Sequence, residues 1–167
     1  FDKILISKSN KPFLQNQVFQ FSISHTSNYA AAIVSKSNNV GIDIEIANER
    51  VMKIAHKFLS DNEMVIFSLN NQNNLNLSIS SSEKNYNVID YDQIKLITIL
   101  WSCKETIYKW WGNGKVDFKK MITIDYFKLE TTSKIDAAFT EGSNSKLTNL
   151  EIDYRLFEDL CLTFTCL

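Results

Sequence analysis

This chain has no long hydrophobic run and no excess of charge of one sign, and each absence excludes a class of protein. No apolar run approaches the roughly 18 residues of a transmembrane helix, so we expect no membrane span. The formal net charge is −1 over 167 residues, which gives no strong electrostatic case for binding nucleic acid or a membrane surface. No secretory signal is visible at the N-terminus.

Cysteine and histidine are also scarce. The three cysteines (Cys103, Cys161 and Cys166) are odd in number and lack metal-site spacing. They predict free thiols in a reducing compartment, and we therefore expect a cytoplasmic protein. The two histidines, His25 and His56, lie too far apart in the chain for zinc-type ligand spacing. Nothing in the sequence resembles a Ser-His-Asp triad or a glycine-rich phosphate loop.

The composition that is present indicates a packed globular core. Hydrophobic residues make up 44% of the chain and aromatic residues 12%. The length suffices for one medium domain or two small halves. The sequence contains no recognisable internal repeat.

The segment Val40–Ile46 alternates strictly between β-branched residues and a set made of Gly41, Asp43 and Glu45. This period of two predicts a strand with one face on a core, and it puts both carboxylates on the same face. Gly41 allows another backbone or a ligand to approach closely. Like charges in this arrangement repel each other unless a cation or a basic group lies between them. The simpler alternative is an amphipathic strand with a wet acidic face.

A second segment, 101–109, has the period of a helix. Trp101, Glu105 and Lys109 follow at four-residue spacing and share one face. The other sides are largely apolar, so the helix should be buried and its few charges should lie in a cleft or need partners. The simpler alternative is a weak surface ion pair between Glu105 and Lys109. The sequence 112–114, Gly-Asn-Gly, predicts the end of this helix.

If the strand and the helix pack together, three carboxylates (Asp43, Glu45 and Glu105) can converge. Hard oxygen ligands of this kind suit Mg²⁺ or Mn²⁺. Lys104 and Lys109 could then hold phosphate oxygens beside the metal. The set favours phosphoryl chemistry on a polyphosphate or pyrophosphate.

A third segment, 19–26, alternates again and should place Phe19, Phe21 and Ile23 inward. His25 then falls where the strand ends, which is a favourable place for a ligand contact. A structural role for this lone histidine is the alternative. A second strand is expected at 29–34.

These three blocks together resemble a known family. Gly-Ile-Asp-Ile-Glu followed by Trp-Ser-x-Lys-Glu-x-x-x-Lys is similar to the paired signature of the 4′-phosphopantetheinyl transferases. The upstream Ser-Ile-Ser-His and Lys-Pro-Phe resemble the Sfp type of that family. The resemblance covers about residues 11–127.

The resemblance implies roles for individual residues. Asp43, Glu45 and Glu105 match the Mg²⁺ ligands, with Mn²⁺ as a possible substitute, and Glu105 would also take a proton from the acceptor serine, directly or through a water held by the metal. Lys109 matches the lysine that contacts the transferred phosphate. The residues that match coenzyme A contacts are Lys11, Ser24, His25 and Lys104. For Lys104 the expectation is either phosphate contact or placement of the helix, and for Trp101 it is packing.

The implied reaction transfers the phosphopantetheine arm of coenzyme A to a serine of an apo acyl or peptidyl carrier protein, with release of 3′,5′-ADP. The pathway could be fatty-acid, polyketide or nonribosomal peptide synthesis, and a monomer is expected. Two alternatives stay open. One is a non-catalytic protein that binds coenzyme A or a carrier protein, and the other is a Mg²⁺-dependent hydrolase of nucleotide pyrophosphates.

The fold class expected is α+β, with an antiparallel sheet and packed helices. The resemblance implies the pseudo-two-fold transferase fold with most of the first half missing: residues 1–39 would be the remnant of the N-terminal half, and residues 40–167 the C-terminal half with the metal site. An Asn- and Ser-rich stretch predicts a mobile loop insertion at 70–92.

Further elements are expected on either side of that loop. Helical spacing predicts a helix within 48–59 and a second one that starts with a capping box at Ser60 and Glu63. Strands are expected at 121–124, 137–139 and 160–166. The basic residues Arg50, Lys53 and Lys57 could form a basic face toward the acidic helix of a carrier protein, although an ordinary solvated face is the simpler interpretation.

Overall fold

The computed structural model of the chain describes residues 3–9, 11–16, 18–69, 90–142 and 146–167. In chain order its strands and helices are β1 (Ile4–Ile6), β2 (Pro12–Leu14), β3 (Gln20–Thr26), β4 (Tyr29–Ser35), β5 (Val40–Ile46), α1 (Arg50–Phe58), α2 (Asp61–Ile66), α3 (Tyr91–Trp111), β6 (Ile122–Ile124), β7 (Thr132–Glu141), β8 (Lys146–Phe157) and β9 (Leu160–Cys166).

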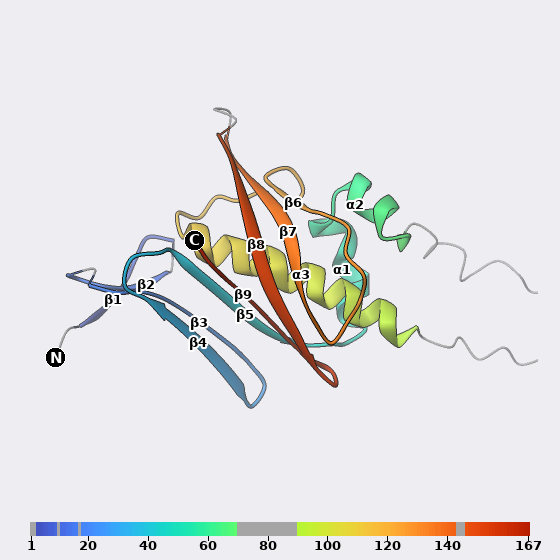
Figure 1. Ribbon diagram of the computed structural model, residues 1–167, viewed down its shortest axis with the longest axis horizontal. Coiled ribbons are helices and arrows are strands. Elements are labelled where there is room, and N and C mark those ends of the chain that lie inside the picture. Colours follow the sequence, from blue (N-terminus) through green and yellow to red (C-terminus); the bar gives the residue numbers. More distant parts are fainter. Residues whose placement is uncertain (1–2, 10, 17, 70–89, 143–145) are drawn as a thin grey trace, which may run out of the picture.

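One antiparallel sheet of five strands, in the order β5-β9-β8-β7-β6, organises the molecule. Helix α3 crosses one face of this sheet, and α1 and α2 lie beside the helix (Figure 1). The core forms between sheet and helix, because the inward residues of both are apolar: Ile97, Leu100, Cys103 and Ile107 of α3 are fully buried, as are Ile152 and Tyr154 of β8. The strands expected at 121–124, 137–139 and 160–166 are confirmed as β6, part of β7, and β9.

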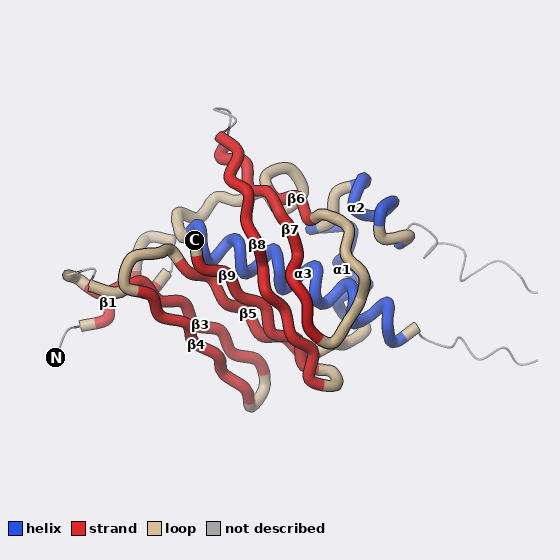
Figure 2. The backbone as a smooth tube through the Cα atoms, in the orientation of Figure 1, coloured by secondary structure: helices blue, strands red, loops and turns tan. Residues whose placement is uncertain are grey.

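Two small hairpins, β1-β2 and β3-β4, lie outside the five-stranded sheet (Figure 2). The β3-β4 hairpin runs along the free edge of β5. Two serine hydroxyls of β3 accept hydrogen bonds from that edge, Ser22 from the N–H of Ile42 at 3.2 Å and Ser24 from the N–H of Ile44 at 3.3 Å. An edge strand has N–H groups without ladder partners, and these hydroxyls satisfy two of them.

The expected inward face of β3 is therefore wrong. Phe19 and Ile23 are exposed, at 38% and 54%, whereas Ser22 is buried at 3%. The serine face of β3 turns toward β5 because it supplies hydrogen-bond acceptors there, and the apolar residues turn outward.

Helix α3 begins and ends on recognisable capping residues. The side chain of Asp90 accepts hydrogen bonds from the N–H groups of Asp92 and Gln93, and Gly112 closes the helix with φ of 71°. The predicted helix and its glycine stop are confirmed. Residues 90–92, expected within the loop insertion, are instead the cap and first turn of α3, while residues 70–89 lie outside the described part of the chain.

Two short helices lie in the described residues between β5 and α3, at positions 47–69. Helix α1 buries Val51, Ala55 and Phe58, in agreement with the predicted face. Helix α2 starts at the predicted capping box, in which the Ser60 side chain accepts from the N–H of Glu63 and the Glu63 side chain accepts from the N–H of Ser60.

The expectation of an α+β fold with an antiparallel sheet is confirmed. The pseudo-two-fold arrangement and the division at residue 40 stay predictions, although the five-stranded sheet takes all its strands from β5 onward. Of the helices described, none combines the length and the hydropathy of a membrane span.

Candidate active site

Helix α3 lies unusually close to β5 at Gly41. A Cβ atom at this glycine would lie 2.1 Å from the carbonyl oxygen of Thr106 and 2.8 Å from the backbone nitrogen of Trp110. No side chain fits into that space. The face of β5 that carries Gly41, Asp43 and Glu45 is therefore turned toward α3, and the alternative of a wet acidic face is excluded, because Asp43 is only 3% exposed.

Asp43 is the centre of the site. Its Oδ1 accepts a hydrogen bond from Nζ of Lys109 at 2.7 Å and another from Oγ of Ser24 at 2.9 Å. Its Oδ2 accepts from Oγ of Ser102 at 2.8 Å. Three elements, β3, β5 and α3, thus meet on one buried carboxylate.

Lys109 joins Asp43 to the β3-β4 hairpin. Its ammonium group also donates to Oγ of Ser24 at 2.8 Å, and the side chain stays 24% exposed. An ammonium group has three donors, and within the described part of the chain two of them have partners in these contacts. Lys109 therefore forms its ion pair with Asp43. The alternative from the sequence, a surface ion pair between Glu105 and Lys109, is not what the structure shows.

Glu45 and Glu105 lie in the same electrostatic environment as Asp43. Burial raises the pKa of the Glu45 carboxyl, and the negative charge of Asp43 raises it further, while the indole of Trp101 and the charge of Lys109 lower it. The Nε1–H group of Trp101 donates to Oε1 of Glu45 at 3.3 Å. Trp101 thus does more than pack against Phe58, whose ring centroid lies 5.0 Å away.

The surroundings of the Glu105 carboxyl raise its pKa strongly. Burial is the largest cause that raises its pKa to about 7, followed by the charge of Asp43; Lys109 opposes the shift and Glu45 adds to it. Carboxylates that raise each other's pKa repel each other, and a cation placed among them relieves that repulsion.

The charges of the three predicted metal ligands act on one another, but these residues do not form a ready-made cluster. Among the described residues, no group of three or more His, Cys, Asp or Glu side chains is placed to hold a metal ion. The cation that Asp43 does contact is the ammonium group of Lys109. The three side chains still suit a divalent ion such as Mg²⁺, because all of them offer hard carboxylate oxygens. Their combined negative charge also exceeds the single positive charge of Lys109.

Lys104 does not contact the Asp43 site. Its side chain is 0% exposed and its ammonium donates to Oε2 of Glu63 at 2.8 Å and to the carbonyl oxygens of Phe118 and Ile122 at 2.8 and 3.1 Å. All three donors of the ammonium are used inside the protein. Of the two expectations for Lys104, placement of the helix is favoured over phosphate contact.

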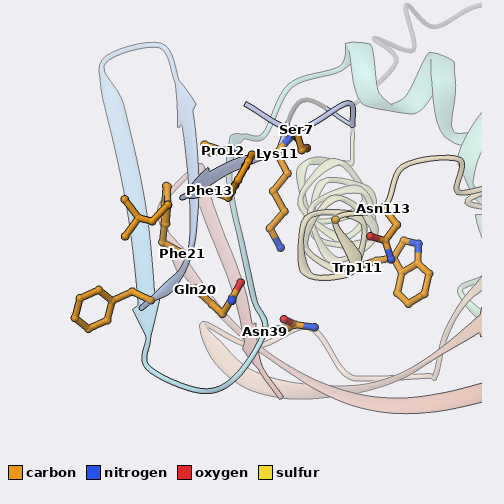
Figure 3. A pocket seen from close by; sticks show the side chains of 12 residues that line it. Ser7, Lys11, Pro12, Phe13, Gln20, Phe21, Asn39, Trp111 and Asn113 are labelled. Atoms are coloured by element: carbon orange, nitrogen blue, oxygen red, sulfur yellow. Dashed lines mark hydrogen bonds between the residues drawn. The ribbon is translucent and has the colours of Figure 1, made fainter. Parts of the chain in front are cut away.

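Lys11 lies at the C-terminal end of α3. Its Nζ is 3.4 Å from the carbonyl oxygen of Trp110, and burial lowers the pKa of its ammonium group. Figure 3 shows its side chain directed toward this end of the helix, across from Asn113. Lys11 lines two cavities. One of about 320 Å³ is also lined by Phe13 and Trp111, and one of about 440 Å³ is also lined by Tyr108 and Lys109.

Ser24 and His25 point in different directions, because they are neighbours on a strand. Ser24 faces Asp43, as its hydrogen bond shows. His25 is exposed and shares its side of β3 with Ile23, which lines the larger cavity.

The sequence analysis missed several residues of the site. These are Ser22, Ser102, Thr106 and Thr163, together with the indole donor of Trp101. Ser102 was within the motif that was singled out, but its neighbour on β5 could be identified only once the helix and strand were placed side by side.

Comparison with known proteins shows which family the chain resembles. The chain matches, over residues 39–165, the model of a family described as the 4′-phosphopantetheinyl transferase superfamily. It is also 27% identical over 182 aligned residues to the protein named 4′-phosphopantetheinyl transferase gsp of Aneurinibacillus migulanus. That alignment covers 98% of this chain and 68% of the relative. The matched family region contains β5 and α3, the two elements that carry the site.

Proposed function

Because the chain belongs to the 4′-phosphopantetheinyl transferase superfamily and is a transferase, we propose that it transfers the phosphopantetheine arm of coenzyme A to a serine of an apo acyl or peptidyl carrier protein in a Mg²⁺-dependent reaction, with release of 3′,5′-ADP. One observation carries this proposal: the buried Asp43 holds Lys109 at 2.7 Å, and the charges of both residues act on Glu45 and Glu105. Free thiols at Cys103, Cys161 and Cys166 agree with action in a reducing compartment such as the cytoplasm.

Asp43, Glu45 and Glu105 would hold the divalent cation. When bound, a Mg²⁺ ion neutralises charge on a pyrophosphate and on its leaving group. Lys109 would then turn from Asp43 toward a phosphate oxygen, which its partly exposed side chain permits. Ser24 would keep a hydrogen bond to Asp43 when Lys109 moves away.

The cavity of about 440 Å³ beside Lys109 is the place that suits the nucleotide end of coenzyme A. Lys109 and Lys11 both line this cavity. Each could therefore place a cationic group beside one of two phosphates. His25, on the same side of β3 as Ile23, would be within the same region for the 3′-phosphate. These are the roles that the family resemblance implies for Lys11, His25 and Lys109.

In the reaction, the carrier serine oxygen forms a bond to the phosphorus that bears pantetheine. The bond from that phosphorus to the bridging oxygen breaks, and the oxygen leaves with 3′,5′-ADP. Glu105 takes the proton of the serine hydroxyl, and Lys109 stabilises the charge on the leaving group. No covalent enzyme intermediate is needed, so positioning and electrostatics supply the catalysis.

The carrier protein would approach along α1 and Trp101. Two surface hollows adjoin Trp101, and both are also lined by Ile54 of α1; one includes Glu45 and Arg50, the other Lys57 and Phe118. Exposed basic residues of α1 beside an apolar hollow suit a carrier with an acidic helix.

The test is to measure release of 3′,5′-ADP from coenzyme A with an apo carrier protein, without it, and with a carrier whose acceptor serine is replaced by alanine. Transfer predicts release only with the intact carrier. Release in all three reactions would indicate a hydrolase instead. Binding of coenzyme A without release in any of them would indicate a non-catalytic binder.

A further inference from the structure

A chain of buried hydroxyl groups supports Asp43 from the side opposite to Lys109. Ser102, Thr106 and Thr163 are each 0% exposed. Oγ of Ser102 lies 2.8 Å from Oδ2 of Asp43 and 2.9 Å from Oγ1 of Thr163, and Oγ1 of Thr163 lies 2.6 Å from Oγ1 of Thr106. We propose that Ser102, oriented by Thr163 and Thr106, is a positioning residue that fixes the Asp43 carboxylate for metal binding; this inference rests on the proposed function.

The direction of the hydrogen bond to Asp43 follows from the chemistry of the groups. An ionised carboxylate can only accept, so Ser102 must give its single hydroxyl proton to Asp43. Oγ1 of Thr163 has two acceptors of Ser102 within reach, Oγ at 2.9 Å and the backbone carbonyl oxygen at 3.0 Å. Oγ1 of Thr106 likewise lies 2.6 Å from Oγ1 of Thr163 and 3.2 Å from the carbonyl oxygen of Thr163. These contacts hold the Ser102 side chain in place beside Asp43.

The fold explains why these residues meet. Thr163 on β9 is the cross-strand partner of Asp43 in the register of the sheet. Ser102 and Thr106 are one turn apart on α3, on the side that contacts β5. The same contact is the close approach at Gly41, where the carbonyl of Thr106 leaves no room for a side chain. The hydroxyl chain is therefore locked between helix and sheet.

The two oxygens of Asp43 consequently have different roles. Oδ2 is bound to a fully buried hydroxyl, whereas Oδ1 is bound to Ser24 and to Lys109, whose side chain is 24% exposed. If Lys109 turned to a phosphate, Oδ1 would lose the hydrogen bond from Lys109 and keep the one from Ser24, while Oδ2 would stay bound to Ser102. This change would make room for a cation at the carboxylate. Ser102 thus sets the rotation of the carboxylate, as groups behind a metal ligand commonly do.

The test is direct titration of the full chain with Mn²⁺, read by electron paramagnetic resonance, which does not depend on turnover. Replacing Ser102→Ala should weaken Mn²⁺ binding roughly 10- to 100-fold, the usual cost of losing such a partner. Thr163→Val removes the hydroxyl that contacts Ser102 and should weaken Mn²⁺ binding by a smaller factor. This variant provides the test if Ser102→Ala does not fold.

Thr98→Val is the matched control. Thr98 is also a buried hydroxyl on α3, at 2% exposure, but it donates to the carbonyl of Ile94 and not toward Asp43. It should bind Mn²⁺ as the unaltered chain does. At saturating metal, Ser102→Ala should keep a KM for coenzyme A within about twofold of normal, because Ser102 contacts Asp43 and its loss acts on metal binding.

Three outcomes can be told apart. Weakened Mn²⁺ binding in Ser102→Ala, with Thr98→Val unchanged, supports the role. Equal Mn²⁺ binding in Ser102→Ala and the unaltered chain overturns it and leaves the transferase proposal standing. If the unaltered chain binds no Mn²⁺ either alone or with coenzyme A, the proposed metal site fails and this inference fails with it.

Discussion

The ammonium group of Lys109 lies 2.7 Å from Oδ1 of Asp43, although the two residues are 66 positions apart in the chain. Lys109 thereby acts as the counter-ion of a buried carboxylate and ties the last turns of α3 to β5. The same side chain is 24% exposed, and the proposed function has it turn toward a phosphate. Replacing Lys109 should therefore affect both the stability of the fold and the reaction.

Replacing Lys109→Met should lower the transfer rate by about two to three orders of magnitude, because a preorganised positive charge is lost where negative charge develops. Asp43 would also lose its charged partner, so the free energy of unfolding should fall by about 1–3 kcal/mol. Enzyme kinetics and urea unfolding measure the two effects. The matched control is Lys120→Met, since that side chain is 83% exposed and pairs only with Asp117 at 3.7 Å; a normal rate in Lys109→Met would remove Lys109 from the mechanism.

Glu105→Gln should abolish transfer and yet stabilise the metal-free protein at high pH. The folded pKa of about 7 lies above the ordinary value of 4.5, so the folded chain binds this proton more tightly than the unfolded chain and stability falls as the pH rises between the two values. Above pH 7 the penalty is fully present, about 1–3 kcal/mol after allowance for partial exposure. The charged groups that set it are Asp43 and Glu45, opposed by Lys109.

The measurement for Glu105 is thermal unfolding in EDTA. At pH 8 the variant should melt several degrees above the unaltered chain, and at pH 4.5 the two should coincide. A variant that melts lower at pH 8, or that still transfers at the normal rate, would contradict the placement of this carboxyl.

The buried pair of Lys104 and Glu63 should matter for stability and not for coenzyme A. Lys104→Met leaves a buried carboxylate without its counter-ion and should cost about 3–5 kcal/mol in urea unfolding. Glu63→Gln combined with Lys104→Met removes both charges while glutamine can keep the capping box, so the double variant should be more stable than the sum of the single effects predicts. If each single variant lowers the free energy of unfolding by less than about 1 kcal/mol, the pair is unimportant for stability. If Lys104→Met folds but has a much higher KM for coenzyme A, the interpretation of Lys104 as a phosphate contact is favoured again.

His25→Ala should weaken coenzyme A binding about tenfold with little change in the maximal rate, because a contact at the nucleotide end acts equally on ground and transition states. His56→Ala on α1 is the matched control, as the other histidine of the chain and also exposed. Isothermal titration with coenzyme A and steady-state kinetics measure the two quantities. A large loss of maximal rate with normal affinity would contradict the assigned role.

The sequence predicted those parts of the fold that depend on local pattern. The alternation at Val40–Ile46, the helix stop at Gly112 and the capping box at Ser60 all have their causes within a few neighbouring residues, and all three are confirmed. The capping-box glutamate, Glu63, was found in this way, but its second role as partner of Lys104 depends on a contact 41 positions away.

The parts that could not be predicted depend on which surfaces meet. Alternation in β3 identified two faces but not which one turns inward, because the deciding factor is the free edge of β5 and its need for the hydroxyls of Ser22 and Ser24. In the same way Ser102 and Thr163 are ordinary residues in the sequence and become a hydroxyl chain only across α3 and β9. Strand β8 was not predicted at all, although it supplies the buried Tyr154.

The central claim is tested most directly by the intact mass of an apo carrier protein incubated with this chain, coenzyme A and Mg²⁺, with an EDTA control. We predict that the carrier gains the mass of one phosphopantetheine unit, that EDTA prevents the gain, and that the Glu105→Gln variant does not produce it. A carrier whose mass stays unchanged with the unaltered chain, under conditions in which coenzyme A binds, would contradict the proposed transfer.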